Sequence, residues 1–271
     1  MGNSLAQNFF QDADKVSFSR SLGIVPDPWQ ARVLRDPSKR ICIAAARQTG
    51  KSTTSAILAL RQATVFPNSV VLVTAPSQRQ ALLLFQRIAG LYKAQSIDNK
   101  IPSTDALKMK LELVNGSVIH ALPGSERTVR GFTADMVIAD EAARLPDDGA
   151  IVSALSPALS TRNGTLILIS TPAGDIGFFR DAFFSGEWSS HLATVDDCPR
   201  ITMEFLATER ATMPERIFRQ EFYCEWISAP GAVFTTAEVD AGFTDEVTPV
   251  LVPSKVLGPG FDPFNDRSTG T

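Results

Sequence analysis

Two short segments of the sequence carry residues that suit nucleotide chemistry. The first, IAAARQTGKS at 43–52, ends in Gly50, Lys51 and Ser52. A loop of this kind directs backbone N–H groups and a helix N-terminus at phosphate oxygens, and its lysine reaches the β- and γ-phosphates. The hydroxyl of Ser52 would complete a Mg²⁺ shell. The segment therefore predicts an ATP-binding phosphate loop, with three further residues at the nucleotide: Arg47, Gln48 and Thr49.

The second segment, MVIADE at 136–141, is an apolar strand that ends in two carboxylates. Asp140 would hold Mg²⁺ through water, and Glu141 would orient and deprotonate the attacking water. Both motifs occur in the order that nucleoside triphosphatases use, which makes ATP hydrolysis the leading hypothesis.

The phosphate loop departs from the usual pattern at one position. Ala45 stands where the standard loop has glycine, six residues before Lys51, so easy access to positive φ is lost there. Arg47 adds a second cation to the loop. The alternative interpretation, an ordinary strand–turn–helix with Gly50 as its hinge, leaves the acidic pair unexplained.

Composition limits the class of protein. The chain has 271 residues, 44% of them hydrophobic, and a net charge of −3, so any nucleic-acid contact must come from a local patch. Three scattered cysteines and two histidines make a structural zinc site or a disulfide framework an unattractive hypothesis. The N-terminus lacks an apolar signal-like core, and no apolar run reaches membrane-spanning length. We therefore expect a soluble intracellular protein.

The apolar pattern predicts strands that alternate with helices. Buried-type strands are expected at 40–45, 69–75, 135–140, 165–170 and 191–195. Helices are expected at 1–20, 29–34, 50–64, 77–94, 176–184 and 201–226, the last divided at Pro214. The segment 107–122 alternates polar and apolar residues around Asn115-Gly116, which predicts a β-hairpin.

This order predicts an α/β fold, a mainly parallel sheet with helices on both faces. The strand at 69–75 falls in the chain between the two motifs. It is expected to lie between their strands in the sheet, as in P-loop NTPases of the additional-strand type with a catalytic glutamate. The motifs would then meet at strand carboxyl ends, where open α/β sheets bind ligands.

With these residues in place, the chain resembles the large subunit of the terminase of tailed bacteriophages, a DNA-packaging motor. The resemblance runs from Trp29 to Asp262 and rests on these segments in series: PWQ at 28–30, ARQTGKS at 46–52, VTAPSQRQA at 73–81, NGSVIHALPG at 115–124, VRGFTADMVIADEAA at 129–143, ISTPAG at 169–174 and FRQEFYCEW at 218–226. Ala45 and the loop arginine are themselves typical of that family.

The resemblance implies an ATPase motor domain that uses Mg²⁺ and ATP to move double-stranded DNA into a prohead. Implied partners are the portal protein, the terminase small subunit and further copies in a homo-oligomeric ring. The implied location is the cytoplasm of the infected host cell, transiently at the portal.

Several site roles follow from the same resemblance. Gln30 would read the adenine edge, and the alternative is an exposed glutamine at a helix start. Arg47 would steady the γ-phosphate or turn towards Glu141, unless it is only a solvated loop residue. Arg130 resembles an arginine finger inserted into a neighbouring subunit's site. Two nearby arginines stay open as alternatives: Arg127 and Arg144.

Ser170 and Thr171 resemble the family's coupling motif, at the end of a strand expected beside the acidic strand; alone, Ser-Thr-Pro is a strand end with a proline stop. Lys108 and Lys110 on the hairpin are candidate DNA contacts, with Lys93 and Lys100 before them. Lysines on an exposed strand also discourage edge pairing, which is the alternative.

The predicted organisation has three parts: an ATPase core at 1–200, a small lid subdomain at 201–250, and a linker with the start of a nuclease domain at 251–271. Asp262 resembles the first metal-binding carboxylate of the family's RNase H-like nuclease. Because the remaining carboxylates do not follow, no DNA cleavage is expected from this chain.

Two rival functions remain at this point. A DEAD-like helicase shares a glutamine, a phosphate loop, an acidic pair and a serine-containing motif, but it needs a second RecA-like domain. A nucleotide-gated assembly subunit would bind ATP between ring neighbours with little turnover, and the presence of Glu141 argues weakly against it.

Overall fold

The structure is a computed structural model that describes residues 14–95, 103–107, 109–125, 131–146 and 148–227, together with Gly242. Residues Met1–Gly231 form one compact unit, and Ala232–Thr271 form a second, of which only Gly242 is described. The domain boundaries at 200 and 250 stay predictions, and the segment 251–271 lies outside the described residues.

In the described part of the chain, eight strands form one sheet in the order β3-β4-β5-β2-β6-β7-β1-β8. The six strands from β5 to β8 in this order pair in parallel, whereas β3 and β4 add an antiparallel edge. The bounds are β1 Arg40–Ala45, β2 Val70–Ala75, β3 Ser103–Leu107, β4 Lys110–Leu113, β5 Val118–Pro123, β6 Met136–Asp140, β7 Thr165–Ser170 and β8 Ser189–Ala193.

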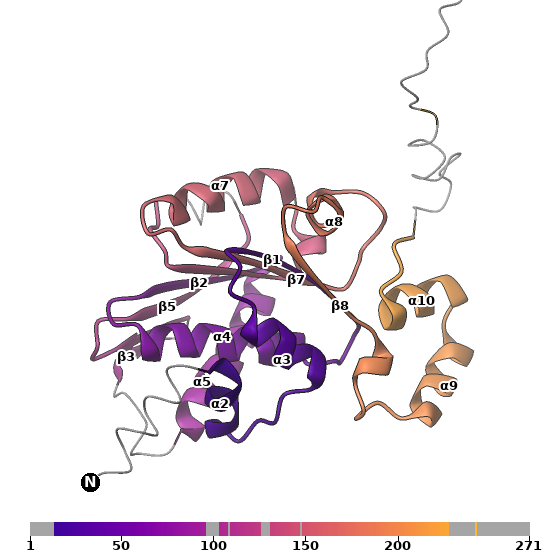
Figure 1. Ribbon diagram of the computed structural model, residues 1–271, viewed down its shortest axis with the longest axis horizontal. Helices are drawn as coiled ribbons and strands as arrows, with labels where there is room; N and C mark the ends of the chain where they lie inside the picture. The colour runs from indigo at the N-terminus through magenta and orange to yellow at the C-terminus, as the bar shows by residue number, and fades with distance from the viewer. Residues whose placement is uncertain are drawn as a thin grey trace, which may run out of the picture. The chain divides into compact units, whose positions relative to one another are not determined.

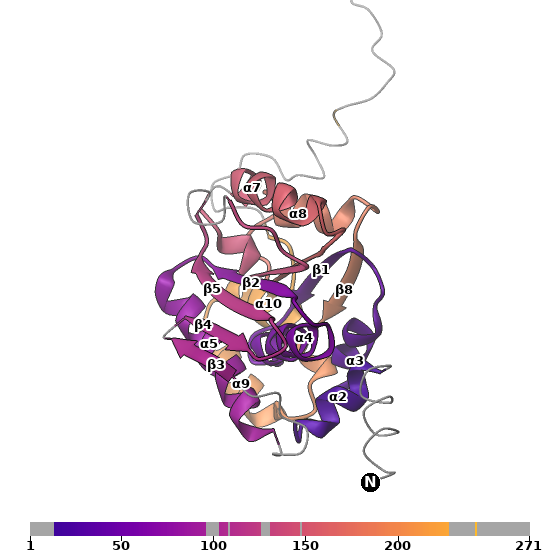
Figure 2. The same ribbon diagram turned by 90° about the vertical axis from the view of Figure 1, so that its left-hand side faces the viewer.

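Helices cover both faces of the sheet (Figure 1). One layer contains α2 Lys15–Ser21, α3 Pro28–Arg35, α4 Lys51–Val65 and α5 Gln78–Ala94. The other contains α7 Asp148–Ser160 and α8 Phe178–Phe184, and the view turned by 90° shows the same division (Figure 2). Because both faces are covered, every residue of β6 is buried, and the central strands read as continuous apolar runs. None of the helices in the described residues is long and apolar enough to cross a membrane.

Most predicted elements are confirmed within a few residues. The apolar stripe of α5 is buried as expected, at Ala81, Leu84, Phe85 and Ile88. The hairpin is also confirmed: β4 and β5 pair antiparallel around a turn in which Gly116 has a φ of 82°. Of the helix expected at 1–20, the described residues show only α2.

The predicted strand order is wrong in one respect. One strand does lie between β1 and β6, as expected for the additional-strand type, but it is β7 and not the strand at 69–75. β2 lies on the outer side of β6, between β6 and β5. Position in the chain does not determine position in the sheet, because a crossover helix can return the chain on either side of a strand.

The helix α7 was not predicted. Its sequence contains Gly149 and an internal Pro157, both of which disfavour a helix interior. The buried residues Val152, Leu155 and Leu159 nevertheless have helical spacing, and they pack into the core on this face of the sheet. Tertiary packing therefore outweighs local propensity here. The strand β3 was also missed.

Two short helices follow the sheet, α9 Met203–Thr212 and α10 Glu215–Tyr223. Pro214 caps the second helix, as the sequence predicts. They share a small hydrophobic cluster of Val195, Leu206, Phe218 and Phe222, separate from the two core clusters that flank the sheet. After α10, the Trp226 ring packs among three phenylalanines of α8: Phe179, Phe183 and Phe184.

Asp36 connects the end of α3 to the edge strand β8. Its carboxylate accepts hydrogen bonds from Ser189 Oγ at 2.5 Å and from the Ser38 backbone at 2.8 Å, and it lies 2.6 Å from His191 Nε2. Burial alone would raise the pKa of Asp36, but the hydrogen bonds from Ser189, His191 and Ser38 outweigh it and hold the pKa well below its usual range.

We predict that Asp36→Asn destabilises the fold by about 2 kcal/mol at pH 7. The folded pKa lies below the unfolded pKa, so the carboxylate's contribution is present above about pH 4 and declines as the pH falls further. Urea unfolding at pH 7 and pH 3 measures both points. Asp181→Asn, at an exposed ion pair with Arg180, is the control and should change little. The same loss at both pH values would contradict this account.

Candidate nucleotide-binding site

The phosphate loop joins β1 to α4 and explains why alanine is tolerated at position 45. Ala45 is the last residue of the extended strand β1, and its side chain is buried in the core. In the loop, positive φ falls instead on Gln48, at 59°, and on Gly50, at 102°. Glycine is therefore needed at Gly50, which caps the N-terminus of α4, and not at Ala45.

Lys51 is buried and turned back towards its own loop. Its Nζ donates to the Ala45 and Ala46 carbonyls, at 3.2 and 3.1 Å, and to Thr171 Oγ1 at 2.8 Å. Burial lowers the pKa of Lys51, while the charges of Glu141 and Asp140 oppose that shift. All three acceptors are neutral, so an anionic phosphate oxygen would be a stronger partner for the ammonium group.

Asp140 and Ser52 place two oxygen-bearing side chains together at the site. Ser52 Oγ donates to Asp140 Oδ2 at 3.3 Å. Burial, and after it the charge of Glu141, raises the pKa of Asp140 to about 6, against the opposing effects of Lys51 and Ser52. Two protein oxygens suit Mg²⁺, which usually keeps water and phosphate oxygens as its other ligands. These residues therefore fit the predicted metal.

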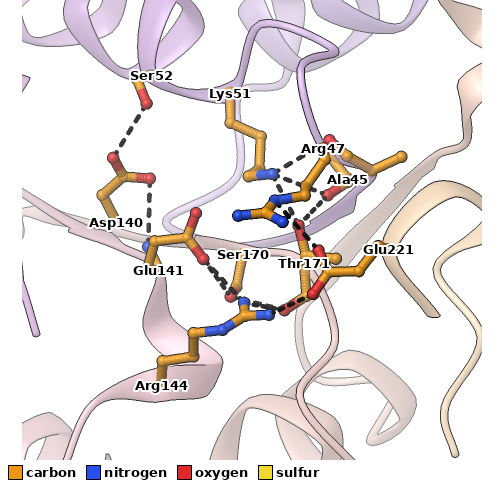
Figure 3. Close-up of polar contacts among 11 residues, drawn as sticks. Ala45, Arg47, Lys51, Ser52, Asp140, Glu141, Arg144, Ser170, Thr171 and Glu221 are labelled. Carbon is orange, nitrogen blue, oxygen red and sulfur yellow. Dashed lines mark hydrogen bonds and ion pairs between the residues drawn. The ribbon is translucent and has the colours of Figure 1, made fainter. Parts of the chain in front are cut away.

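Glu141 follows Asp140 in a left-handed backbone conformation, with a φ of 53°. Its Oε2 accepts from Arg144 Nη1 at 3.0 Å and from Ser170 Oγ at 3.4 Å (Figure 3). Such backbone strain in a residue other than glycine is concentrated at functional sites. Here it directs the carboxylate towards the end of β7.

The end of β7 lies between the phosphate loop and the acidic pair. Ser170 is in register with Ala44 of β1, and its neighbour Ile169 is in register with Asp140 of β6. Thr171 Oγ1 donates to the Ala45 carbonyl at 3.0 Å and accepts from Lys51. The coupling role of Ser170 and Thr171 stays a prediction.

Gln30 lies beside the phosphate loop, but both ends of its amide are engaged. Oε1 accepts from the Asp27 N–H at 2.9 Å, while Nε2 donates to Thr54 Oγ1 at 3.0 Å and to the Gly50 carbonyl at 3.3 Å. Gln30 is buried, so the alternative of an exposed helix-start glutamine is wrong. The adenine-reading role stays a prediction. In this structure the amide supports the loop.

A cavity of about 1020 Å³ opens over these residues. Its charged lining residues include Arg47, Lys51 and Glu141, and its apolar ones include Phe205 of α9, Met213 just after α9 and Ile217 of α10. A lining that combines charged and apolar side chains suits a nucleotide, whose phosphates are charged and whose base is flat and weakly polar.

Two arginines that the sequence analysis did not single out also line the cavity. Arg200 forms a two-pronged ion pair with Asp27, both contacts at 2.6 Å, and Arg87 Nη1 donates to Thr53 Oγ1 at 2.9 Å. The lack of any acidic residue in α4 and α5 was the available signal for Arg87. Nothing local in the sequence pairs Arg200 with Asp27.

Other predicted residues have different surroundings or are not described. Arg47 lies 3.5 Å from Glu221 Oε2, so in this structure it is paired with Glu221 and not with Glu141, and its phosphate role stays a prediction. Lys110 forms an ion pair with Glu112, and its DNA role stays a prediction. Arg144, an alternative candidate for the arginine finger, forms ion pairs with Glu141 and Glu221 of the same chain. Five other predicted residues lie outside the described ranges: Lys100, Lys108, Arg127, Arg130 and Asp262.

The fold and the site together define a P-loop NTPase of the additional-strand type. The profile of the family described as terminase large subunit, T4likevirus-type, N-terminal, matches residues 42–240. The chain therefore belongs to the terminase large-subunit family. The family model that it matches describes the N-terminal part of such subunits.

Individual relatives agree with this assignment. The terminase large subunit of Escherichia phage T5 is 30% identical over 227 residues, which cover 79% of this chain and 51% of that protein. That of Thermus phage G20c is 28% identical over 260 residues, covering 80% and 52%. The ATPase domain of the Thermus phage P74-26 large terminase superimposes with a TM-score of 0.67 at 25% identity, covering 77% of this chain and 97% of that one.

The chain spans about half the length of the curated relatives that it matches. In contrast, it accounts for nearly all of the P74-26 ATPase domain. The similarity thus concerns the ATPase half of such proteins, as the sequence analysis predicts.

We predict that Gly50→Ala weakens ATP binding at least about tenfold. An added Cβ would lie 2.7 Å from Gln30 Nε2, at a φ that alanine rarely adopts. Calorimetric titration with ATP measures the effect. Gly90→Ala is the matched control, because a Cβ in the middle of α5 meets no atom within 4 Å. It should leave affinity unchanged and stabilise the fold slightly. Equal affinity in both variants would contradict the geometry.

Proposed function

We propose that this chain is an ATPase motor domain that couples Mg-ATP hydrolysis to translocation of double-stranded DNA. The observation that carries the proposal is the meeting of Lys51 with Asp140 and Glu141 at the ends of β1 and β6, the two strands that flank β7, where Lys51 and Glu141 line one cavity. Membership of the terminase large-subunit family supports it. The large terminase of a thermophilic bacteriophage was solved in complex with ADP and with ATP-γ-S, which is in keeping with nucleotide use by such proteins.

Each residue has a definite task in this mechanism. Lys51, released from its carbonyl partners, binds the β- and γ-phosphate oxygens, while loop N–H groups and the start of α4 hold the phosphate chain. Glu141 accepts a proton from water as the water oxygen attacks the γ-phosphorus. The bond from that phosphorus to the bridging oxygen then breaks, giving ADP and phosphate.

Ser52 and Asp140 would hold the Mg²⁺, which supplies charge neutralisation at the β- and γ-phosphates when bound. Asp140 would hold it, through water, in the carboxylate form. Lys51 lies close enough to favour that charged form of Asp140.

The partners follow the family's role. In this proposal several copies form a ring at a portal protein in the host cytoplasm, with the terminase small subunit delivering DNA. Arg130 of one copy completes the site of its neighbour by stabilising the charge of the transition state. Gln30 reads the adenine after releasing part of its loop contacts, and Ser170 and Thr171 transmit loss of the γ-phosphate.

The family assignment does not favour the DEAD-like helicase. A nucleotide-gated assembly subunit without turnover keeps one observation in its favour: Glu141 is bound by Arg144 and Ser170 in this structure, so its carboxylate is not free. Turnover measurements separate that function from a motor.

We predict that Glu141→Gln lowers the ATP turnover number about 10²- to 10⁴-fold, because an amide cannot accept the proton of water. ATP affinity should stay within about threefold, since Lys51 and the loop are untouched. Phosphate release and calorimetric binding measure the two quantities. Undiminished turnover in Glu141→Gln would remove Glu141 as the base. A wild type that binds ATP without hydrolysing it would favour the assembly subunit.

We further predict that turnover per chain rises with protein concentration and that Arg130→Ala abolishes this rise. A finger supplied by a neighbour acts only after chains assemble, and it contributes about 10³- to 10⁵-fold. Turnover at increasing concentrations of the wild type and of Arg130→Ala measures it, with Arg127→Ala as the comparison. If turnover per chain is independent of protein concentration, and is the same in the wild type and in Arg130→Ala, the finger role is excluded.

A further inference from the structure

Glu221 of α10 contacts two arginines from different parts of the nucleotide site. Its Oε1 accepts from Arg144 Nη2 at 3.0 Å, and its Oε2 lies 3.5 Å from Arg47 Nε. Its backbone carbonyl also accepts the Arg47 N–H at 2.8 Å. The Glu221 side chain is only 12% exposed, so these two arginines, and not water, are the main neighbours of its carboxylate. One residue of α10 is therefore connected to the phosphate loop and to the turn that follows the acidic pair.

Arg144 links that carboxylate to the proposed general base. While Nη2 donates to Glu221, Nη1 donates to Glu141 Oε2 at 3.0 Å and to the Thr171 carbonyl at 3.2 Å (Figure 3). A guanidinium holds its donors in one plane, so the positions of these acceptors are mutually dependent. A displacement of Glu221 must therefore turn or release the guanidinium that holds Glu141.

The surroundings of α10 show why this connection would transmit motion. The apolar cluster of α9 and α10 includes Val195 and is separate from both core clusters beside the sheet, so among the described residues these helices share no buried apolar cluster with the strands that carry the site. Beyond α10, Trp226 packs on Phe179 and Phe183 of α8. The end of this segment is thus anchored by apolar contact, while its attachment at the site consists of polar contacts that a nucleotide could exchange.

We propose that Arg144 is a positioning residue that couples α10 to Glu141 through Glu221, so that the position of α10 sets the orientation of the general base. This inference rests on the proposed ATPase function and adds a path from nucleotide occupancy to catalysis within one chain. Arg144 is not among the residues that line the cavity. Its effect is exerted on the Glu141 carboxylate.

The test is a double-mutant cycle on the full chain with Arg144→Ala, Glu221→Gln and the combined variant. Each single change should lower kcat at least about tenfold and change the calorimetric Kd for ATP less than about threefold. The combined variant should be no slower than the slower single variant, because both changes break the same connection. The proposal is overturned if the fold-losses in kcat of the two single variants multiply in the combined variant. An unchanged or raised kcat in either single variant would overturn it as well.

Glu225→Gln is the matched control. Glu225 is two residues beyond α10 and forms a surface ion pair with Arg219 at 2.7 Å, so its loss should leave kcat unchanged. If Glu225→Gln lowers kcat as Glu221→Gln does, the effect belongs to general loosening of this segment, and the specific connection is refuted.

A second measurement separates this inference from the proposed function. Hydrogen exchange of α10 amides should slow when ATP-γ-S binds the wild type, and at least half of that slowing should be lost in both Arg144→Ala and Glu221→Gln. If the wild type hydrolyses no ATP, the ATPase function fails, yet the exchange result still decides the coupling. Equal slowing in all three proteins would overturn the coupling even in an active ATPase.

Discussion

The parallel pairing of β6, β7 and β1 is the constraint on which the rest of the site depends. Parallel strands end at the same edge of a sheet, and their register brings Asp140, Ser170 and the start of the phosphate loop together there. With β7 between the other two strands, the hydroxyls of Ser170 and Thr171 separate the lysine side of the site from the carboxylate side. Each hydroxyl contacts the side nearer to it, Thr171 with Lys51 and Ser170 with Glu141.

Burial of opposite charges makes this edge responsive to nucleotide. Lys51 and Asp140 are both buried. Burial lowers the pKa of Lys51 and raises that of Asp140, which favours the neutral form of each. Their mutual attraction counters that shift but leaves the lysine with neutral acceptors and the carboxylate with one hydroxyl and one backbone N–H. A phosphate chain with a divalent cation supplies the missing partner to each at once, which is why both are expected to bind together.

The local sequence pattern predicted most of this arrangement. Strands buried on both faces appear in the sequence as apolar runs, and the residues of the phosphate loop are consecutive in the chain. It failed where long-range packing decides. Nothing in the segment 69–75 states on which side of β6 it pairs, and the helix α7 forms despite Gly149 and Pro157. Ala45 shows the reverse case: the usual loop pattern marks alanine there as unfavourable, whereas the structure has its positive φ at Gln48 and Gly50 instead.

Glu221 marks the limit of such prediction most clearly. Within α10 it reads as one acidic residue of an amphipathic helix, for which a solvated surface position is the default. Its role depends on ion pairs with Arg47 and Arg144, which are distant in the chain and lie outside α10. Since a buried carboxylate is tolerated only beside such partners, the two arginines and Glu221 constrain one another. The site and α10 therefore form one electrostatic unit, in which a phosphate that attracts Arg47 must also change the balance at Arg144 and Glu141.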